Sequence, residues 1–176
     1  DGLKYLEHYQ YECTEQTISR FLPNVLSFAA LKKLGVNDAA LEASLKTRVN
    51  VGAQKLYAGQ HADGGWGWWT TDRSDPYITS YVVFGLNRSK QAGFDVDAKV
   101  LKLGADYLKK QILSPNTIKT TWELNRQAFM LYTLADADDK SVTSSITNLY
   151  EARGRLDTYA RSYLALAIAK LAPKDS

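Results

Sequence analysis

Apolar residues recur at intervals of three and four positions along almost the whole chain, and this helical spacing constrains the fold more than any other feature. Only 4 prolines and 11 glycines interrupt the pattern over 176 residues. The sequence therefore predicts an all-α protein. A chain of this length buries roughly 70% of its unfolded surface, so we assign residues 1–176 to a single domain.

The expected helices run mostly for roughly 12 to 22 residues with short connectors, which is typical of paired antiparallel helices. We place them at residues 3–9, 14–34, 38–59, 77–92, 96–112, 123–135, 141–153 and 157–171. Gly35 is expected to end the second helix, and Asn37 or Asp38 to cap the third. Pro23 is expected to kink or split the second helix, because proline has no N–H to donate. The residues expected on the buried sides of these two helices are Ile18, Phe21, Leu22, Val25, Leu26, Leu31, Leu41, Leu45, Val49 and Leu56.

The charge of the chain is nearly balanced. Its formal net charge of +3 comes from 22 basic and 19 acidic residues spread along the sequence, without the clusters that follow a phosphate backbone. We therefore expect no nucleic-acid partner. No apolar stretch reaches the roughly 18–20 residues that span a bilayer, so we expect no direct membrane contact from this segment. The chain begins abruptly and ends inside a helical pattern, which indicates a piece of a larger polypeptide.

Cysteine and histidine are scarce. The one cysteine, Cys13, excludes an intrachain disulfide and leaves the compartment open, because an acylated thiol survives even in an oxidising space. The two histidines, His8 and His61, are isolated, and with one cysteine they do not supply the ligands of a metal site at a usable spacing. We expect neither a metal nor a cofactor.

Cys13 stands three residues before Gln16, and that spacing permits an unusual reaction. At the start of a helix, positions three apart lie on one face with Cβ atoms about 5–6 Å apart, so the thiol meets the Gln16 carboxamide. Attack of the thiolate, with loss of ammonia, closes an internal thioester, and the free N–H groups of a helix N-terminus stabilise the developing charge. The ordinary alternative for a single cysteine is a small buried hydrophobe. A catalytic dyad of Cys13 with His8 is a further alternative.

Thr14 and Glu15 lie between the two reacting residues. We expect their roles to be geometric, with Thr14 or Cys13 near the helix cap and Glu15 complementing the positive end of the helix dipole. The alternative for Glu15 is a solvated first-turn carboxylate.

A long loop follows the third expected helix and is rich in tryptophan. Residues 60–76 read Gln-His-Ala-Asp-Gly-Gly-Trp-Gly-Trp-Trp-Thr-Thr-Asp-Arg-Ser-Asp-Pro. The indoles of such a turn either pack into the domain or remain exposed to contact a binding partner. An intact thioester must be kept dry, and aromatic walls suit that purpose. The candidate shielding residues are Tyr9, Tyr11, Trp66, Trp68 and Trp69, and the alternative for each is ordinary packing within the domain.

Residues 9–23 read Tyr-Gln-Tyr-Glu-Cys-Thr-Glu-Gln-Thr-Ile-Ser-Arg-Phe-Leu-Pro, a run that resembles the thioester region of α2-macroglobulins and complement-like proteins, especially the bacterial α2-macroglobulins. The motif of that family is Gly-Cys-x-Glu-Gln, followed by an amphipathic helix that often carries a proline and an asparagine, as at Pro23 and Asn24. Residues 64–69 and 74–82 resemble the Gly-Gly-Phe/Trp loop and the helix after it in the same domain. These matches, in the family's order, carry the resemblance.

The resemblance implies an α/α toroid, in which paired helices form an inner and an outer ring. The family's toroid has about twelve helices and this chain offers about eight, which implies the N-terminal part of a thioester-containing domain.

The same resemblance implies a broad-spectrum protease inhibitor of bacterial defence that is periplasmic, envelope-anchored as a lipoprotein, or secreted. A target protease cleaves a bait segment elsewhere in the chain, and the exposed thioester then acylates a lysine amine of that protease. The captured protein stays attached to Gln16, so each molecule reacts once and is a trap rather than an enzyme. The implied partners are target proteases and the other domains of the same macroglobulin chain.

Two departures from the family's pattern bear on this chemistry. Glu12 stands where the family often has glycine, which alters the local turn but leaves the rest of the motif in place. Family members that acylate hydroxyls use a histidine far beyond the cysteine, whereas the histidines of this chain are His8 and His61. We therefore expect amines rather than hydroxyls as acceptors.

Two other classes of protein are alternatives. One is a helical toroid without thioester chemistry that only packs against neighbouring domains. The other is an enzyme similar to class II terpene cyclases, which are also α/α toroids and whose Asp-x-Asp-Asp run and Gln-x-x-x-Gly-x-Trp repeat are matched by residues 136–139 and 60–66. We expect residues 136–139 to form a solvated cap and turn between two helices.

Overall fold

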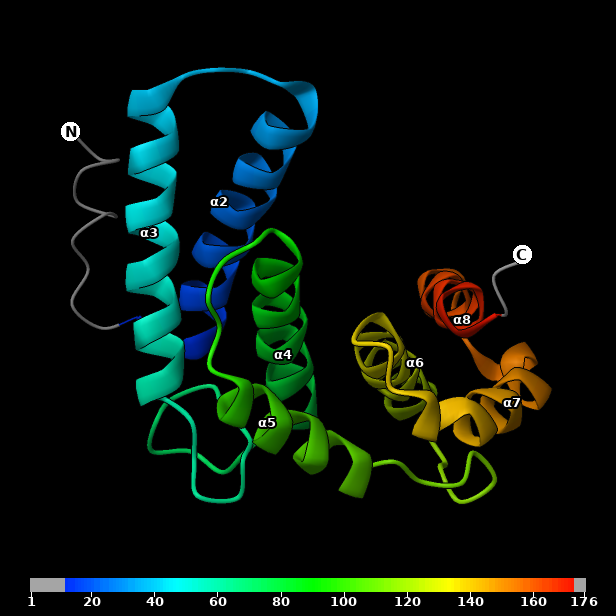
Figure 1. Ribbon diagram of the computed structural model, residues 1–176. Coiled ribbons are helices and arrows are strands. Elements are labelled where there is room, and N and C mark those ends of the chain that lie inside the picture. The colour runs from blue at the N-terminus through cyan, green and yellow to red at the C-terminus, as the bar shows by residue number, and fades with distance from the viewer. Residues whose placement is uncertain (1–11, 173–176) are drawn as a thin grey trace.

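The computed structural model describes residues 12–172 as a succession of helices (Figure 1). Within these residues there are seven α-helices and two short 3₁₀-helices, and no strand. The elements are α2 (Thr14–Leu34), α3 (Ala39–Ala58), α4 (Pro76–Gln91), α5 (Ala98–Lys110), α6 (Thr121–Asp136), η1 (Lys140–Val142), α7 (Thr143–Glu151), η2 (Arg153–Arg155) and α8 (Thr158–Leu171). The all-α prediction is confirmed, while the helix predicted at residues 3–9 lies outside the described residues.

Alternate helices, α2, α4, α6 and α8, pack side by side and run in the same direction. Contacts between α6 and α8 show this at both ends. Near the start of each helix Asn125 donates to the Asp157 carboxylate over 2.7 Å, and near the end of each Lys170 pairs with Asp136 over 2.8 Å. The end of α4 reaches the same point, because Asn87 donates to the Asp136 carbonyl over 3.0 Å.

The helices α3, α5 and α7 lie between these in the sequence and return the chain to its starting end (Figure 1). The α2–α3 pair is antiparallel: Lys32 at the end of α2 pairs with Glu42 at the start of α3 over 2.9 Å. A parallel row of helices with antiparallel returns is the arrangement of an α/α toroid. The N-termini of α2, α4, α6 and α8 consequently share one edge, which we call the rim.

The buried core joins these helices to the loop before α4. Ile18, Phe21 and Val25 of α2 are buried, and so is Trp66 of the loop, which is 0% exposed. Among residues 12–172 no helix is both long and apolar enough to cross a membrane. The loop that precedes α4 is therefore part of the folded core and not an appendage.

The predicted ends of α2 and α3 are confirmed. Gly35 adopts a left-handed conformation with φ 65° at the end of α2, and the Asp38 carboxylate accepts from the Leu41 N–H over 2.9 Å at the start of α3. Of the two outcomes predicted at Pro23, a kink or a split, the split is wrong, because α2 continues through Pro23 as one helix. Pro23 is exposed, and the Asn24 side chain supplies an extra donor to the adjacent turn, 2.6 Å from the Arg20 carbonyl.

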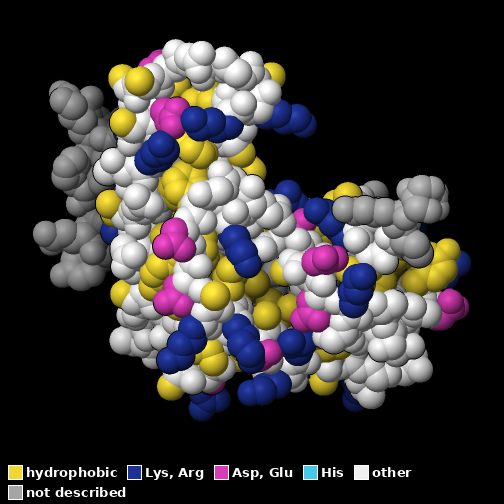
Figure 2. All heavy atoms as spheres, in the orientation of Figure 1, with side chains coloured by type: hydrophobic (Ala, Val, Ile, Leu, Met, Phe, Trp, Pro, Cys, Tyr) yellow, Lys and Arg dark blue, Asp and Glu magenta, His cyan; other side chains and the backbone are white. Residues whose placement is uncertain are grey.

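The prediction of which leucines are buried is wrong at two positions. Leu26 is 49% exposed and Leu41 is 43% exposed, whereas Leu45, Val49 and Leu56 are buried as expected. Leu41 lies near the closed end of the α2–α3 hairpin, which projects beyond the other helices in Figures 1 and 2. Leu26 lies between the buried residues Val25 and Phe28 of α2, so its exposure follows from the side of the helix on which it lies.

The predicted solvated turn at residues 136–139 is wrong for its first residue. The Asp136 side chain is fully buried and pairs with Arg88 over 2.9 Å and with Lys170 over 2.8 Å. Asp138, with φ 62°, makes the turn, and Asp139 caps η1 by accepting from the Ser141 N–H over 3.0 Å. Asp136 of α6 thus joins the ends of three helices, because it pairs with Arg88 of α4 and with Lys170 of α8.

Candidate functional site

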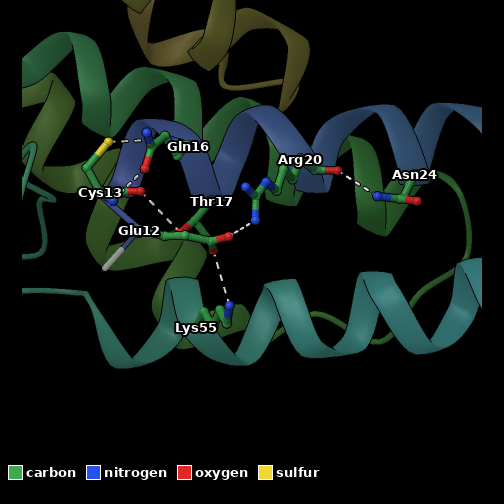
Figure 3. Close-up of polar contacts among 7 residues, drawn as sticks. All are labelled: Glu12, Cys13, Gln16, Thr17, Arg20, Asn24 and Lys55. Atoms are coloured by element: carbon green, nitrogen blue, oxygen red, sulfur yellow. Dashed lines mark hydrogen bonds and ion pairs between the residues drawn. The ribbon is translucent and has the colours of Figure 1, made fainter. Parts of the chain in front are cut away.

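Cys13 is the N-cap of α2, and Gln16 folds back onto it (Figure 3). The Cys13 N–H donates to Gln16 Oε1 over 3.3 Å, and the Gln16 N–H donates to Cys13 Sγ over 3.4 Å. This reciprocal pattern is a capping box, in which a cap residue and the third helical residue satisfy each other's free N–H groups. The structure therefore brings together the thiol and the carboxamide that the sequence singled out.

The remaining bonds of the first turn hold Cys13 in place. Its carbonyl accepts from the Thr17 N–H over 3.0 Å and from the Thr17 hydroxyl over 3.2 Å. Cys13 is partly buried and Gln16 is exposed, so the carboxamide side of the pair faces outward. A nucleophile approaching from solvent would meet Gln16 before it meets the thiol.

Thr14 and Glu15 have different surroundings. Thr14 is buried, and its N–H donates to the Trp68 carbonyl over 2.9 Å. Glu15 is partly buried, and its carboxylate accepts from the Ser19 hydroxyl over 2.6 Å. Cys13 rather than Thr14 occupies the cap position, and Thr14 connects the helix to the tryptophan loop.

The loop of residues 59–75 is shaped by close backbone contacts. Gly64 has φ 91°, and a Cβ atom at this position would lie 2.5 Å from the Leu103 carbonyl oxygen. Only glycine fits such a conformation and such a contact without strain. The Asp75 N–H donates to the Trp66 carbonyl over 2.8 Å, which closes the loop onto the start of α4.

The three tryptophans of the loop occupy different environments. Trp66 is fully buried, and its indole N–H donates to the Leu56 carbonyl over 2.7 Å. Trp68 is 45% exposed and Trp69 is 49% exposed. The indole of Trp66 therefore packs within the domain, and the candidate shielding aromatics that face solvent are Trp68 and Trp69. Tyr9 and Tyr11 lie outside the described residues.

A cavity of about 590 Å³ opens at the rim beside Trp68. Trp68 stacks on Tyr77 with ring centroids 6.5 Å apart. The other lining residues come from the N-cap of α4 and from the first nine residues of α6 and the first six of α8, and are Asp75, Trp122, Asn125, Arg126, Phe129, Tyr159 and Tyr163. Sequence reasoning missed this aromatic cluster. Its residues lie in separate helices and meet only because those helices are parallel.

His61 lies in the loop, as predicted, and organises polar groups there. Its Nδ1 atom is 2.9 Å from the Ser74 hydroxyl, and that hydroxyl donates to the Asp63 carboxylate over 2.7 Å. Burial opposes ionisation of Asp63, but hydrogen bonds from Gly65 and Ser74 and the nearby His61 outweigh it, so the pKa of Asp63 lies below its ordinary value. Among residues 12–172 no group of three or more histidine, cysteine, aspartate or glutamate side chains is placed to hold a metal ion.

Tyrosine side chains near the rim are held in their neutral form. Burial, and then the neighbouring hydroxyls of Tyr163 and Tyr81 and the carboxylate of Glu15, raise the pKa of Tyr77. Burial, followed by the carboxylates of Asp63 and Asp75, raises the pKa of Tyr107 to about 12. Neutral phenols keep the aromatic surface beside α2 free of negative charge at physiological pH.

An all-helical chain with this parallel row, and with a Cys–Gln capping box at the rim, defines a toroidal helical domain with a preorganised thiol and carboxamide. Residues 1–128 match the family described as the A-macroglobulin TED domain. The chain therefore belongs to this family, as a thioester domain of the bacterial α2-macroglobulin type.

Relatives and solved structures agree with this assignment. The α2-macroglobulin of Thermotoga maritima is 43% identical over 110 residues, which cover 62% of this chain and 7% of the relative. That of Escherichia coli K12 is 28% identical over 128 residues, which cover 72% of this chain and 8% of the relative. The chain thus spans less than a tenth of the length of these two curated relatives.

The fold is shared with solved α2-macroglobulins. The structure of the native conformation of the E. coli protein superimposes with a TM-score of 0.78 at 22% identity, covering 97% of this chain and 11% of that one. A Salmonella α2-macroglobulin superimposes with a TM-score of 0.77 at 22% identity, covering 97% and 12%. The prediction of an α/α toroid is confirmed.

Proposed function

We propose that Cys13 and Gln16 form an internal thioester and that the protein uses it once, to acylate an amine of a protease that it traps. In forming the bond, Cys13 Sγ attacks the Gln16 side-chain carbonyl, the C–N bond breaks, and ammonia leaves. In capture, an amine nitrogen attacks the same carbonyl, the C–S bond breaks, and the Cys13 thiol is released. No step regenerates the thioester, so the protein acts as an inhibitor and not as a turnover enzyme.

The observation that carries this proposal is the capping box. Two hydrogen bonds of 3.3 and 3.4 Å hold the Gln16 carboxamide folded back on Cys13, as the cross-link requires. In most capping boxes the cap residue is serine or threonine, which has no comparable acyl chemistry. A cysteine in that place, in a chain of this family, supports the thioester hypothesis over a buried structural thiol.

The helix N-terminus supports the same chemistry. The Gln16 N–H already donates to Sγ, and the positive end of the helix dipole lies beside it. Both features stabilise the thiolate that leaves when an amine attacks. Capture at neutral pH therefore needs no further catalytic group to expel the sulfur.

The family supplies the proposed partners. Among the similar structures, E. coli α2-macroglobulin was activated by trypsin and by porcine elastase, and the Salmonella protein was reacted with methylamine. We extend this to the present protein: its targets are proteases captured through lysine amines, after contacts with other domains of the same chain are released. The corresponding location is the periplasm, the cell envelope or the medium.

Peptide mass spectrometry after methylamine treatment tests the proposal. An intact thioester makes the untreated protein lighter by one ammonia, and methylamine then converts Gln16 to its N-methylamide and frees one thiol. A thioester already hydrolysed leaves a glutamate side chain at position 16. Unmodified Gln16 together with a free Cys13 thiol in every molecule would contradict the proposal.

Two control measurements separate the alternatives. A helical module without thioester chemistry would show no label at Gln16, and Cys13→Ser would leave all its properties unchanged. An enzyme of the cyclase or hydrolase type would show multiple turnover. The thioester trap predicts at most one amine incorporated for each chain, and none in Cys13→Ser.

A further inference from the structure

Glu12, the residue before Cys13, joins α2 to α3 through charge. Its carboxylate accepts from Arg20, further along α2, and from Lys55 near the end of α3 over 3.1 Å (Figure 3). The Glu12 side chain is only 10% exposed, although both cations reach solvent. A largely buried carboxylate between two cations is held more firmly than a surface ion pair.

A cavity adjoins Glu12 on the side of the ion pairs. A cavity of about 310 Å³ lies between the start of α2, the end of α3 and the tryptophan loop. Glu12, Thr17 and Lys55 are among its lining residues. On this side Glu12 faces a cavity, and among the described residues the contacts that hold its carboxylate are the ion pairs with Arg20 and Lys55.

The chain contains a second cluster of the same kind for comparison. Glu42 of α3 accepts from Lys32 over 2.9 Å and from Lys46 over 2.8 Å, and so joins the same two helices at their opposite end. Both clusters place one carboxylate between two cations. Of these two clusters, the one at Glu12 adjoins the Cys13–Gln16 pair.

We propose that Glu12 is a positioning residue for the thioester, and that its ion pairs with Arg20 and Lys55 hold the backbone of Cys13 where the Gln16 acyl group stays folded against it. This inference rests on the proposed function. The link is short: Glu12 fixes the chain entering the cap, and the N–H of the next residue, Cys13, holds Gln16 Oε1. Loss of the carboxylate frees the entering chain, so the acyl group becomes more accessible to water.

The test compares Glu12→Gln with Glu42→Gln in the protein at its natural length. Each variant removes one charge from one α2–α3 cluster. After timed incubation in buffer, methylamine is added and the tryptic peptide 5–20 is analysed by mass for three forms of position 16: the N-methylamide, the hydrolysed glutamate and unmodified Gln16. The decline of the N-methylated fraction with incubation time gives the half-life of the thioester.

We expect Glu12→Gln to shorten that half-life about fivefold, and Glu42→Gln to leave it unchanged. Raising the salt from about 0.05 to about 0.5 M should shorten the wild-type half-life by less than the Glu12→Gln substitution does, and leave that of Glu12→Gln unaffected, because salt screens the exposed cations but acts less on the largely buried carboxylate. Glu12→Asp, which keeps the charge, should recover part of the wild-type half-life. Lys55→Gln should fall between wild type and Glu12→Gln.

Three results would overturn the inference: a Glu12→Gln half-life equal to wild type, an equal effect of Glu42→Gln, or the same salt dependence in wild type and Glu12→Gln. A general loss of stability is recognised by a lowered thermal midpoint in both Gln variants. If wild type yields only unmodified Gln16, the proposed function itself fails and this inference fails with it. If methylamine labels Gln16 in wild type and the variants show the same thioester half-life, only the role of Glu12 is overturned and the proposed function stands.

Discussion

The backbone N–H of Thr14 donates to the carbonyl oxygen of Trp68 over 2.9 Å, so the first turn of α2 and the tryptophan loop form one hydrogen-bonded unit. Thr14 immediately follows Cys13, and the first N–H groups of a helix have no partner within the helix. The loop supplies that partner. Movement of the loop therefore acts on the turn that carries both Cys13 and Gln16.

Thr14→Pro tests this bond. Proline is favoured at the first position of a helix, and Cys13 already has the extended conformation, φ −70° and ψ 163°, that suits a residue before proline. The substitution removes the N–H and also places the proline Cδ against the Trp68 carbonyl oxygen, so the loop must move away from the helix. We expect Thr14→Pro to be at least about 1 kcal/mol less stable than Thr14→Val, which keeps the N–H, in urea unfolding. Equal stability of the two variants would contradict a structural role for the bond.

Gly64→Ala should destabilise the loop through contact and not through backbone conformation alone. Gly64 and Gly93 both have φ 91°, but an added Cβ would lie 2.5 Å from the Leu103 carbonyl oxygen at Gly64 and would meet nothing within 4 Å at Gly93. Gly93→Ala is thus a matched control for the strain of a positive φ. We expect Gly64→Ala to cost about 2 kcal/mol more than Gly93→Ala in chemical denaturation. Similar losses would show that the loop relaxes away from Leu103.

Asp136→Ala should be among the most damaging changes outside the site. It leaves Arg88 and Lys170 without their buried carboxylate, and because both cations still reach solvent we expect a loss of about 1.5–3 kcal/mol, the value of hydrogen bonds to a charged group. Asp138→Asn, two residues on at an exposed turn position, is the control, and we expect a change within about 0.5 kcal/mol. Denaturant midpoints measure both. A mild effect of Asp136→Ala would mean that water replaces the carboxylate.

Ionisation of Tyr107 should lower the stability of the folded protein at alkaline pH. Its hydroxyl donates to the Ser74 carbonyl over 2.9 Å, and burial, then Asp63 and Asp75, raises its pKa from 10.0 to about 12. Because the folded pKa is the higher one, the stability from neutral Tyr107 is complete below pH 10 and is lost as the pH rises to about 12. The free energy of unfolding of wild type should fall more steeply over this range than that of Tyr107→Phe. Parallel pH profiles would contradict the assignment.

Local sequence signals were sufficient for the helices within residues 12–172 and for the proximity of Cys13 and Gln16. Gly35 and Asp38 mark helix ends through their own backbone preferences, and Cys13 and Gln16 meet because three residues of helix bring them together. Each of these features depends on a few neighbouring residues. Such features can be derived without knowledge of the rest of the fold.

Features that depend on contacts between segments far apart in the sequence could not be predicted from the sequence. The burial of Asp136 requires that Arg88 and Lys170, from two other helices, arrive at the same point. The exposure of Leu26, next to the buried Val25, depends on which side of α2 the neighbouring helices cover, and the partner of the Thr14 N–H is a backbone carbonyl, which carries no side-chain signal. These outcomes depend on how the helices are packed against one another.

In the segments before the parallel helices, exposed positions that tolerate substitution alternate with buried positions that do not. The segments that lead into α4, α6 and α8 all reach the rim where Cys13 and Gln16 lie, and each also places one side chain in the core: Trp66, Ile118 and Leu156 are buried. The exposed residues of the same segments, such as Trp68 and Trp69, carry no such packing. Substitutions at the exposed positions therefore change the surface beside Cys13 and Gln16 while the buried positions keep the helices in place.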